Sequence, residues 1–478
     1  MSKDNFVKEI TNIEDDFAKW YTDVVIKTEL ADYTDAKGFI AIRPYGYAIW
    51  ENIQKYADEK FKETGVENVS FPVLIPESLL QKEKDHVEGF APEVAWITEA
   101  GGEKLEERLC LRPTSETIIS TLYSKWLSSW RDLPFVYNQW CNVVRWEKET
   151  RPFLRSREFL WQEGHTIHET AEEAKARTLQ MLDVYEDVIE NFLAIPVLKG
   201  RKTPKEQFAG ADATYTVESM MHDGRALQAG TSHYFGQNFS KPFDIKFQNR
   251  DGKDEYAYQT SWGISTRLIG AIIMAHGDNR GLKLPPKVAP IQVVIVPIAM
   301  QKEGVKEKSE EIYNSLNKKF RTKVDLRDNY TPGFKFNDWE MRGVPVRVEM
   351  GPRDIENGVA ILVRRDTLEK ETVEIANLEN RIAELLEDIQ KSMYNECLKR
   401  REEKTTVAYT LDEIVKNMDE NQGYVKTMWC GDEACEDKVK EATGAHSRCM
   451  PFNQEHLADT CPVCGKKADK MIVWGRQY

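Results

Sequence analysis

Apolar residues recur along the N-terminal part of the chain at two different spacings, which predict a mixture of strands and helices. Residues 39–44 predict a short strand that ends at Pro44, and residues 45–64 predict a long amphipathic helix after it. A second strand is predicted over 69–75. Because Pro72 has no N–H to donate, we expect that strand at a sheet edge or an interface.

A further helix is predicted after residue 170. Thr170 and Glu173 have the spacing of a capping box, which marks a helix start. The apolar positions behind them recur at helical spacing: Leu179, Leu182, Tyr185, Ile189 and Leu193. We expect this helix to be part of the scaffold.

The second half of the chain changes pattern after a stiff linker at 283–287 that contains two prolines. A buried strand is predicted over 291–297, a helix over 306–320 and a strand over 323–326. Alternating strands and helices favour a small α/β domain with a partly parallel sheet. Beyond a charged segment at 399–404, a third piece extends to Tyr478.

The composition is that of a globular protein with more than one domain: 478 residues, 41% hydrophobic and 30% charged. A net charge of −13 does not suit binding of nucleic acid by overall charge, so such a partner would need a local basic surface. Candidates are the runs at 318–321, 364–365 and 399–401, each of which alone is better interpreted as a solvated face.

The N-terminal residues Met1 to Phe6 lack a signal-peptide core, and no apolar stretch is long enough to cross a membrane. We therefore expect a cytoplasmic protein with no membrane partner. Its eight cysteines should be reduced, and clustered cysteines are then better interpreted as metal ligands than as disulfides.

Four cysteines near the C-terminus follow the pattern C-x4-C and C-x2-C: Cys430, Cys435, Cys461 and Cys464. Four thiolates at this spacing suit tetrahedral, structural Zn²⁺. Cys449 and His446 lie between the pairs and remain alternative ligands. Cys110, Cys141 and Cys397 are expected to be free core cysteines.

Three short strings carry the candidate chemistry: Val144 to Glu147, Gln228 to His233, and Gly263 to Arg267. Together they supply two arginines, a carboxylate and several hydroxyls, which suit a nucleoside triphosphate because guanidinium groups bind phosphate in a bidentate way. The chain has neither a G-x-x-x-x-G-K-S/T loop nor a G-x-G-x-x-G fingerprint.

These strings resemble motifs 2 and 3 and the adenosine-contact segment of class II aminoacyl-tRNA synthetases. With 111–117 and 159–165, they resemble the prolyl-tRNA synthetase family in its archaeal/eukaryotic-like form, nearly end to end. The resemblance implies an α+β fold in three domains. These are a class II catalytic domain over 1–282 (an antiparallel sheet flanked by helices), an α/β anticodon-binding domain over 288–400 and a small α/β zinc-binding domain over 405–478.

The resemblance also implies ATP as a substrate, Mg²⁺ on its phosphates and an activation step that forms prolyl-adenylate. Arg145 would contact the α-phosphate and the substrate carboxylate, and Arg267 the γ-phosphate; these two are the expected catalytic residues. Glu147 would bind the adenine amino group, and Phe159, otherwise a core aromatic, would stack on the ring. The remaining implied ATP contacts are Arg155, Ser156, Gln228, Thr231 and Ser265.

A proline pocket needs a carboxylate and a hydroxyl for the secondary ammonium, and apolar walls for the ring. The resemblance assigns the ammonium to Glu116 and Thr114 and the carboxylate to Arg145. Glu163 would support the pocket from behind, although a structural ion-pair partner explains it equally well. The ring would be enclosed by Phe90, Trp161, His165 and Phe208, with His233 beside it. Both histidines remain open as ordinary core residues. Because an apolar pocket discriminates only roughly 10–200-fold, alanine is a plausible wrong substrate.

The implied partners are L-proline, tRNA(Pro) and a second copy of the chain, since the helix–strand–proline unit at 45–75 matches motif 1, which builds the dimer. Glu340, Arg347 and Lys370 would read the anticodon, although ordinary salt bridges explain each of them equally well. No editing domain fits between motifs 2 and 3. The alternatives are a sister ligase of the same class, a synthetase-like binding or regulatory paralogue without catalysis, and a zinc-ribbon nucleic-acid binder.

Overall fold

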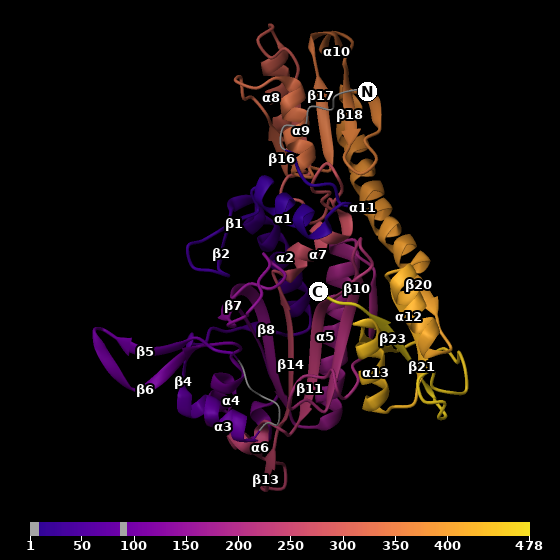
Figure 1. Cartoon of the computed structure of the whole chain (residues 1–478). Helices are drawn as coiled ribbons and strands as arrows, with labels where there is room; N and C mark the ends of the chain where they lie inside the picture. Colours follow the sequence, from indigo (N-terminus) through magenta and orange to yellow (C-terminus); the bar gives the residue numbers. More distant parts are fainter. Residues whose placement is uncertain (1–8, 87–92) are drawn as a thin grey trace.

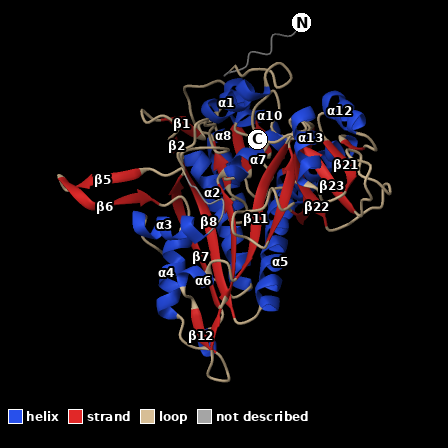
Figure 2. Cartoon of the chain, turned by 60° about the horizontal axis from the view of Figure 1, so that its bottom comes forward, coloured by secondary structure: helices blue, strands red, loops and turns tan. Residues whose placement is uncertain are grey.

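The computed structural model describes residues 9–86 and 93–478. Three parts are visible in Figure 1: a central body, an upper lobe formed by residues near 300–370, and a C-terminal lobe beside the body. The chain combines a large, mainly antiparallel sheet with helices that cover it, so the expected α+β architecture is confirmed (Figure 2).

One large sheet forms the central body and continues into the C-terminal lobe. Its strands, in spatial order, are β20 (Thr405–Val407), β21 (Tyr424–Trp429), β23 (Lys470–Gly475), β22 (His446–Pro451), β9 (Val197–Arg201), β10 (Ala213–Met220), β11 (Ala226–Gly236), β14 (Tyr258–Ser265), β8 (Glu158–His168), β7 (Phe135–Val144) and β3 (Glu67–Asn68). Neighbours pair antiparallel except β3 with β7 and β20 with β21. The C-terminal lobe is therefore joined to the body through β22 and β9.

Helix α5 (Ala171–Asp187) packs against β10, β11 and β14 and begins at the predicted capping box of Thr170 and Glu173. The predicted apolar spacing is wrong at two points. Leu179 is 39% exposed, because it lies on the outer face of the helix. The α-helix also ends at Asp187, and a π-helical segment, η2 (Val188–Phe192), carries the chain into the core.

The predicted strand and helix at 39–64 are confirmed as β2 (Ile40–Ile42), paired with β1 (Ala31–Tyr33), and α2 (Pro44–Glu63). The single strand predicted over 69–75 is wrong. The segment connects β3, which ends at Asn68, to β4 (Leu74–Pro76), and only its last two residues belong to a strand. The two strands belong to different sheets. Side chains satisfy the backbone between them: Phe71 N–H donates to Gln139 Oε1 at 2.6 Å, and Arg112 Nη1 donates to Phe71 O at 2.8 Å.

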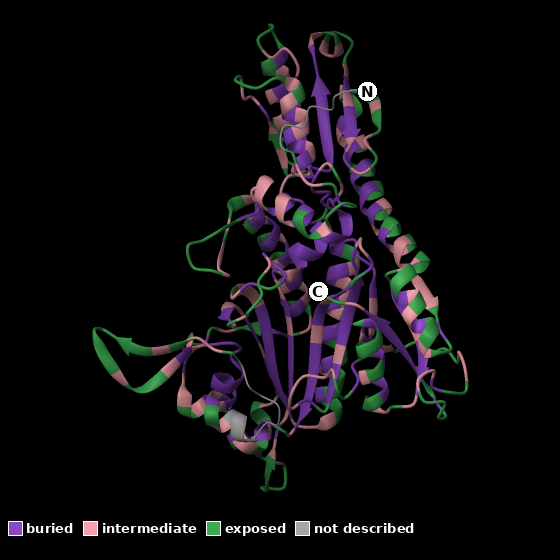
Figure 3. Ribbon diagram, in the orientation of Figure 1, coloured by how far each residue is buried: buried purple, intermediate pink, exposed green. Residues whose placement is uncertain are grey.

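A second core lies at the lower end of the body, with a long hairpin projecting beside it (Figure 1). Its elements are α3 (Glu77–His86), β5 (Trp96–Ala100), β6 (Glu103–Leu111), α4 (Glu116–Trp126), α6 (Ser240–Phe243), β12 (Lys246–Gln248) and β13 (Asp254–Tyr256). Helices α1 (Phe17–Lys27) and α7 (Arg267–His276) pack together at the other end of the body. Figure 3 shows that the strands of the central sheet are mostly buried while the projecting hairpin is exposed.

The upper lobe contains the predicted partly parallel sheet, in the order β16 (Thr322–Val324), β15 (Val293–Pro297), β17 (Val346–Met350), β18 (Val359–Arg364) and β19 (Lys370–Glu374). Its helices are α8 (Val305–Leu316), α9 (Pro332–Met341) and α10 (Pro352–Glu356). Strands β15 to β17 pair parallel, whereas β17 to β19 pair antiparallel. Helix α8 ends four residues before the predicted residue 320.

Helix α11 (Leu378–Glu403) runs from the upper lobe along the body to the C-terminal lobe (Figure 1). Arginines of the three basic runs donate to carbonyls or pair with carboxylates of neighbouring elements, rather than forming a free basic surface. Arg400 donates to Ala275 O, Arg401 to Val197 O and Arg321 to Ala289 O. Arg365 pairs with Asp278 at 2.7 Å. These arginines therefore stabilise the junctions between parts of the molecule.

The C-terminal lobe places α12 (Leu411–Glu420) and α13 (Glu433–Thr443) against β20 to β23. Its last residues return to the body, where Tyr478 N–H donates to Ala226 O and the Tyr478 hydroxyl bonds to Asp223. Within the described part of the chain, no helix has the length and apolar character needed to cross a membrane.

Candidate active site

A cavity of about 240 Å³ opens in the central sheet, slightly below the size usual for drug-like ligands. Its walls come from the start of α4, the strands β8, β10, β11 and β14, the loop between β9 and β10, and Arg145 just after β7. The lining residues are Thr114, Glu116, Arg145, Trp161, Glu163, His165, Glu206, Gln207, Phe208, Thr214, Gln228, Thr231, His233, Ser261, Trp262 and Gly263. Ten of these are among the predicted site residues.

Strand geometry explains why sequence spacing found so many of them. Trp161, Glu163 and His165 alternate along β8 and therefore point to one face of the sheet. On β11, Gln228 and Thr231 are three residues apart, yet both line the cavity. A register shift opposite β10 residues Val217 and Glu218 inserts one extra residue between them and restores the common direction.

Glu163 is the centre of a buried hydrogen-bond network behind the cavity. Its carboxylate accepts from Thr114 Oγ1 at 3.1 Å, Ser115 N at 2.9 Å and Gln139 Nε2 at 3.0 Å, and pairs with His165 Nε2 at 3.0 Å. Burial opposes the charge, but these bonds lower the pKa of Glu163 to about 2. Glu163 thus stays ionised and orients Thr114, whose oxygen retains free lone pairs toward the cavity.

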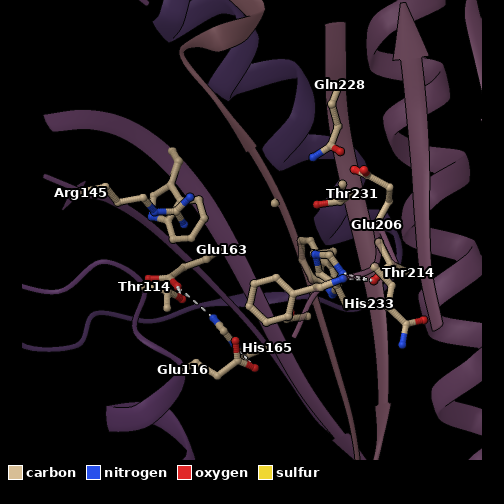
Figure 4. A pocket seen from close by; sticks show the side chains of 16 residues that line it. Thr114, Glu116, Arg145, Glu163, His165, Glu206, Thr214, Gln228, Thr231 and His233 are labelled. Atoms are coloured by element: carbon tan, nitrogen blue, oxygen red, sulfur yellow. Dashed lines mark hydrogen bonds and ion pairs between the residues drawn. The ribbon is translucent and has the colours of Figure 1, made fainter. Parts of the chain in front are cut away.

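Glu116 is the first residue of α4 and faces the cavity beside His165 (Figure 4). Burial raises the pKa of Glu116 to about 7, although His165, whose Nδ1 lies 3.9 Å from Oε1, attracts its charge. Burial also opposes charge on His165, but the hydrogen bond to Glu163 and the proximity of Glu116 raise the pKa of that imidazole. The Glu116 carboxylate is therefore suited to bind a cationic ligand.

His233 forms the opposite side of the cavity and is held neutral. Thr214 Oγ1 lies 3.0 Å from His233 Nδ1 and accepts from Phe208 N at 2.9 Å. The Phe208 ring lies 4.8 Å from the imidazole, centroid to centroid. Burial, together with the charge of His165, lowers the pKa of His233 to about 3. Phe208 and His233 thus form one continuous wall.

Arg145 lies at one end of the cavity. Its Nε donates to Pro113 O at 3.0 Å, and its guanidinium lies over the rings of Phe159 at 5.4 Å and Trp161 at 5.3 Å. Among the described residues, no carboxylate lies within ion-pair distance of Arg145. Its Nη atoms are consequently available to an anion.

Arg267 is the first residue of α7. Like Arg145, it forms no ion pair with a carboxylate among the described residues. Its side chain donates to Leu154 O at 3.3 Å and to Gln228 O at 3.4 Å. Burial, together with the positive charges of Arg145 and Arg155, lowers the pKa of Arg267 to about 10. Arg145 and Arg267 therefore lie close to Arg155 without an ion-paired carboxylate of their own among the described residues, an arrangement suited to a polyanion.

The other predicted nucleotide residues lie around these arginines, outside the cavity lining except for Gln228 and Thr231. Glu147 pairs weakly with Arg155 at 3.8 Å. Ser156 is buried, and its hydroxyl has no hydrogen-bond partner in the protein, so this hydroxyl is free to form a hydrogen bond with a ligand. Ser265 Oγ accepts from Arg267 N at 3.2 Å. Phe159 lies at 6.0 Å from Trp161, edge to face.

Six lining residues were not predicted: Glu206, Gln207, Thr214, Ser261, Trp262 and Gly263. Ser261 and Gly263 alternate with the predicted Ser265 on β14, so strand periodicity carried a signal for them. Glu206 and Gln207 lie in an irregular loop, for which periodicity carries none. The predicted Phe90 lies outside the described residues.

The four predicted zinc ligands come together in the C-terminal lobe, with their sulfur atoms within 4.8 Å of one another. Cys430 Sγ lies 3.7 Å from Cys435 Sγ and 3.6 Å from Cys464 Sγ. Tetrahedral Zn–S bonds of 2.3 Å require sulfur atoms about 3.8 Å apart, so the set fits the metal. The alternatives lie elsewhere: Cys449 is buried beside Gly200, and His446 pairs with Glu206 at 2.9 Å.

The predicted anticodon residues also come together, on one face of the upper lobe. Arg347 pairs with Glu340 at 2.9 Å and with Glu349 at 2.8 Å, and Lys370 pairs with Glu349 at 3.2 Å. Phe336 lies under the Arg347 guanidinium at 4.5 Å. The three residues thus form ordinary salt bridges, which was the alternative to anticodon contacts that the sequence left open.

Family models match three stretches of the chain. Residues 96–276 match the tRNA synthetase class II core domain (G, H, P, S and T), residues 292–385 the anticodon binding domain, and residues 411–478 the prolyl-tRNA synthetase C-terminal domain.

Full-length relatives are also found. The proline–tRNA ligase of Alkaliphilus oremlandii is 61% identical over 473 residues, covering 99% of this chain and 98% of the relative. Proline–tRNA ligase 2 of Bacillus cereus is 62% identical over 472 residues, covering 99% of both. The corresponding ligase 2 of Clostridioides difficile is 60% identical over 474 residues, covering 99% of this chain and 98% of the relative. With this agreement along its whole length, the chain belongs to the prolyl-tRNA synthetase family of class II aminoacyl-tRNA synthetases.

Proposed function

We propose that this protein attaches L-proline to tRNA(Pro) in two steps, with prolyl-adenylate as the intermediate. The main support is one juxtaposition: a small cavity with the buried Glu116 carboxylate opens onto Arg145, and Arg145 lies near a second guanidinium, Arg267, that forms no ion pair with a described carboxylate. An amino acid with a cationic nitrogen and a nucleotide polyphosphate fit these two halves.

The amino acid would be held at both ends. Glu116 and the lone pairs of Thr114 would receive the two N–H groups of the secondary ammonium. Trp161, Phe208 and His233 would enclose the ring, with His165 beneath it. Arg145 would bind the substrate carboxylate, and Glu163 would hold Thr114 and His165 in place.

In the first step, a carboxylate oxygen of proline attacks the α-phosphorus of ATP. The bond to the bridging oxygen of pyrophosphate breaks, and pyrophosphate takes the electron pair. The attacking group is already ionised, so positioning and charge neutralisation carry the catalysis. Arg145 would stabilise the α-phosphate and Arg267 the γ-phosphate, as the two catalytic residues.

Around the nucleotide, Phe159 would stack on adenine and Glu147 would accept from its amino group. Arg155, Ser156, Gln228, Thr231 and Ser265 would bind the ribose and phosphates. Mg²⁺ would add neutralising charge when bound. Within the described residues the only cluster of three or more metal-ligating side chains is the four cysteines, so phosphates and water would supply most Mg²⁺ ligands.

The other expectations remain part of the proposal. Cys430, Cys435, Cys461 and Cys464 would hold a structural Zn²⁺. Glu340, Arg347 and Lys370 would exchange their mutual salt bridges for anticodon bases. The motif 1 region would form a homodimer, and the site of action would be the cytoplasm, in keeping with the unpaired state of all eight cysteines.

Proline-dependent exchange between ATP and labelled pyrophosphate tests the proposal directly. The full-length protein is assayed with proline and a panel of amino acids that includes alanine, threonine, serine, glycine and histidine. We expect strong exchange with proline, followed by prolylation of tRNA(Pro). Absence of exchange with proline would instead favour a paralogue without catalysis.

A further inference from the structure

The loop at 202–212 connects β9 to β10 and forms one wall of the cavity. It supplies Glu206, Gln207 and Phe208 to the lining. Its internal hydrogen bonds are few: Glu206 N–H donates to Thr203 O at 3.1 Å, Ala211 N–H to Phe208 O at 3.0 Å, and Gln207 Nε2 to Ala211 O at 2.8 Å. The position of the loop therefore depends on what lies outside it.

The C-terminal lobe holds this loop at three consecutive points. Thr203 Oγ1 donates to Glu436 Oε1 at 2.8 Å and lies 3.2 Å from Ser447 Oγ. Lys205 pairs with Asp437. Glu206 pairs with His446 Nδ1 at 2.9 Å.

The strongest of these contacts are buried. Thr203 is fully buried, and Glu436 is only 5% exposed. Hydrogen bonds to charged groups in such surroundings contribute more than exposed ones, and leaving the carboxylate unpaired there would be costly. The Lys205–Asp437 pair is half-exposed and contributes little. The anchor thus rests mainly on Thr203, Glu436 and His446.

The anchor and the zinc cluster share one turn of helix. Helix α13 begins at Glu433, three residues after Cys430, and contains Cys435. The next residue, Glu436, holds Thr203. The conformation that brings Cys430 and Cys435 together therefore also sets the direction of the Glu436 side chain.

We propose that the C-terminal lobe positions the amino-acid-binding loop, with Thr203, Glu436 and His446 as positioning residues for substrate selectivity. The inference rests on the proposed function and deepens it. Phe208 and Glu206 keep their places in the cavity because the lobe holds the backbone on their N-terminal side. Loosening this anchor should weaken contacts to the proline ring, while the nucleotide half, formed by β8, β11 and α7, stays intact.

Thr203→Val tests the proposal, because it keeps the side-chain shape and removes the hydroxyl. We expect the KM for proline to rise about tenfold, the equivalent of one hydrogen bond of about 1.4 kcal/mol, with kcat and the KM for ATP nearly unchanged. Alanine makes no ring contact, so the proline-to-alanine ratio of kcat/KM should fall by a similar factor. Thr203→Ser should restore both values.

Hydrogen–deuterium exchange on the full chain gives a readout independent of activity. Amides of peptides covering 204–211 should exchange faster in Thr203→Val, and after zinc removal by a chelator, than in the untreated protein. Lys426→Gln breaks the Lys426–Glu455 pair in the same lobe, away from the loop, and serves as the matched control with unchanged KM and exchange. If Thr203→Val does not fold, His446→Gln provides the same measurements.

An unchanged KM for proline together with unchanged exchange at 204–211 would overturn the positioning role. Equal increases in the KM for proline and the KM for ATP would also overturn it, because they would indicate general destabilisation. If the unmodified protein shows no exchange reaction with proline, the proposed function fails, whereas deuterium exchange still decides whether the lobe anchors the loop.

Discussion

Arg145 and Arg267 concentrate positive charge where no described carboxylate balances it within ion-pair distance. In most globular proteins buried arginines are paired, because an uncompensated buried charge is costly. Here burial and the charges of Arg145 and Arg155 lower the pKa of Arg267 to about 10, so the protein itself disfavours this cation. A residue arrangement that costs stability without a ligand indicates a binding role.

Arg267→Ala should therefore lower kcat/KM in pyrophosphate exchange by roughly 100- to 1,000-fold, the loss typical of one transition-state donor. Arg267→Lys should recover little, because an ammonium cannot bind phosphate as a fork. Arg381→Ala is the control with unchanged activity. Arg381 lies on α11 and pairs with Glu371 and Glu384. Full activity of Arg267→Ala would contradict the mechanism while leaving the fold unaffected.

Glu116 leads to a prediction on pH. Because burial raises its pKa to about 7, Glu116 is mostly protonated below that pH, and binding of the proline ammonium must first remove this proton. The KM for proline should rise up to tenfold for each pH unit below about 7 and level off above about 8. Exchange kinetics from about pH 5.5 to 8.5 measure this. Glu116→Gln should have a high KM without that slope; an equal slope in both proteins would assign the titration to another group.

At the scale of elements, alternation along β8 brings Trp161, Glu163 and His165 into one site, and a close approach between strands shapes it. Gly164 pairs with Trp262 across β8 and β14, and a Cβ at Gly164 would lie 2.1 Å from the Trp262 ring. Only glycine admits the ring of Trp262, a residue that lines the cavity. Similarly, α13 and the loop after Thr460 bring the two cysteine pairs together.

Removal of one cysteine ligand tests the metal site at this scale. Cys430→Ser should abolish stoichiometric zinc and lower the melting temperature of the C-terminal lobe, because zinc affinity contributes directly to the folding of small metal sites. Metal content by mass spectrometry and thermal unfolding with and without chelator are the measurements. Cys397→Ala, at a buried cysteine far from the cluster in sequence, should keep its zinc. Retention of zinc by Cys430→Ser would point to a different ligand set.

At the scale of the whole molecule, the central sheet passes from the body into the C-terminal lobe without interruption. Pairing of β22 with β9 is reinforced by a buried ion cluster, in which Glu218 binds Lys202 at 2.8 Å and Arg448 at 2.8 Å. All three side chains are at least 97% buried. Burial opposes the charge of Glu218, but Arg448 and Lys202 lower its pKa to about 2. The central body and the C-terminal lobe are thus expected to unfold together.

Glu218→Gln should lower the free energy of unfolding by roughly 3–5 kcal/mol, because it leaves two buried cations without their anion. In the unmodified protein the contribution of Glu218 is present above pH 4.5 and is lost as the pH falls toward about 2, since the folded pKa lies below the unfolded one. Urea unfolding at neutral and acidic pH measures both effects. Glu455→Gln, at an exposed ion pair with Lys426, should change stability by at most about 1 kcal/mol. A similar loss in both variants would refute the role of burial.

The sequence by itself determined the elements with strong local signals: the helix capped by Thr170, the first two strands of the upper lobe (β15 and β16), the residues that alternate on β8, and the four cysteines. These signals are periodic or depend on close spacing, so they survive without knowledge of the fold. The segment at 69–75 was predicted wrongly because Arg112 and Gln139, distant in sequence, supply its hydrogen bonds.

Only the tertiary structure decided which distant residues meet. The continuation of the sheet through β9 and β22, the cluster of Glu218 with Arg448, and the anchoring of Thr203 by Glu436 each join residues more than 200 positions apart. No local pattern encodes such contacts, because they arise from the packing of whole elements. For the same reason, the sequence identified a zinc cluster and an amino-acid pocket separately, and the fold alone placed them on two sides of one loop.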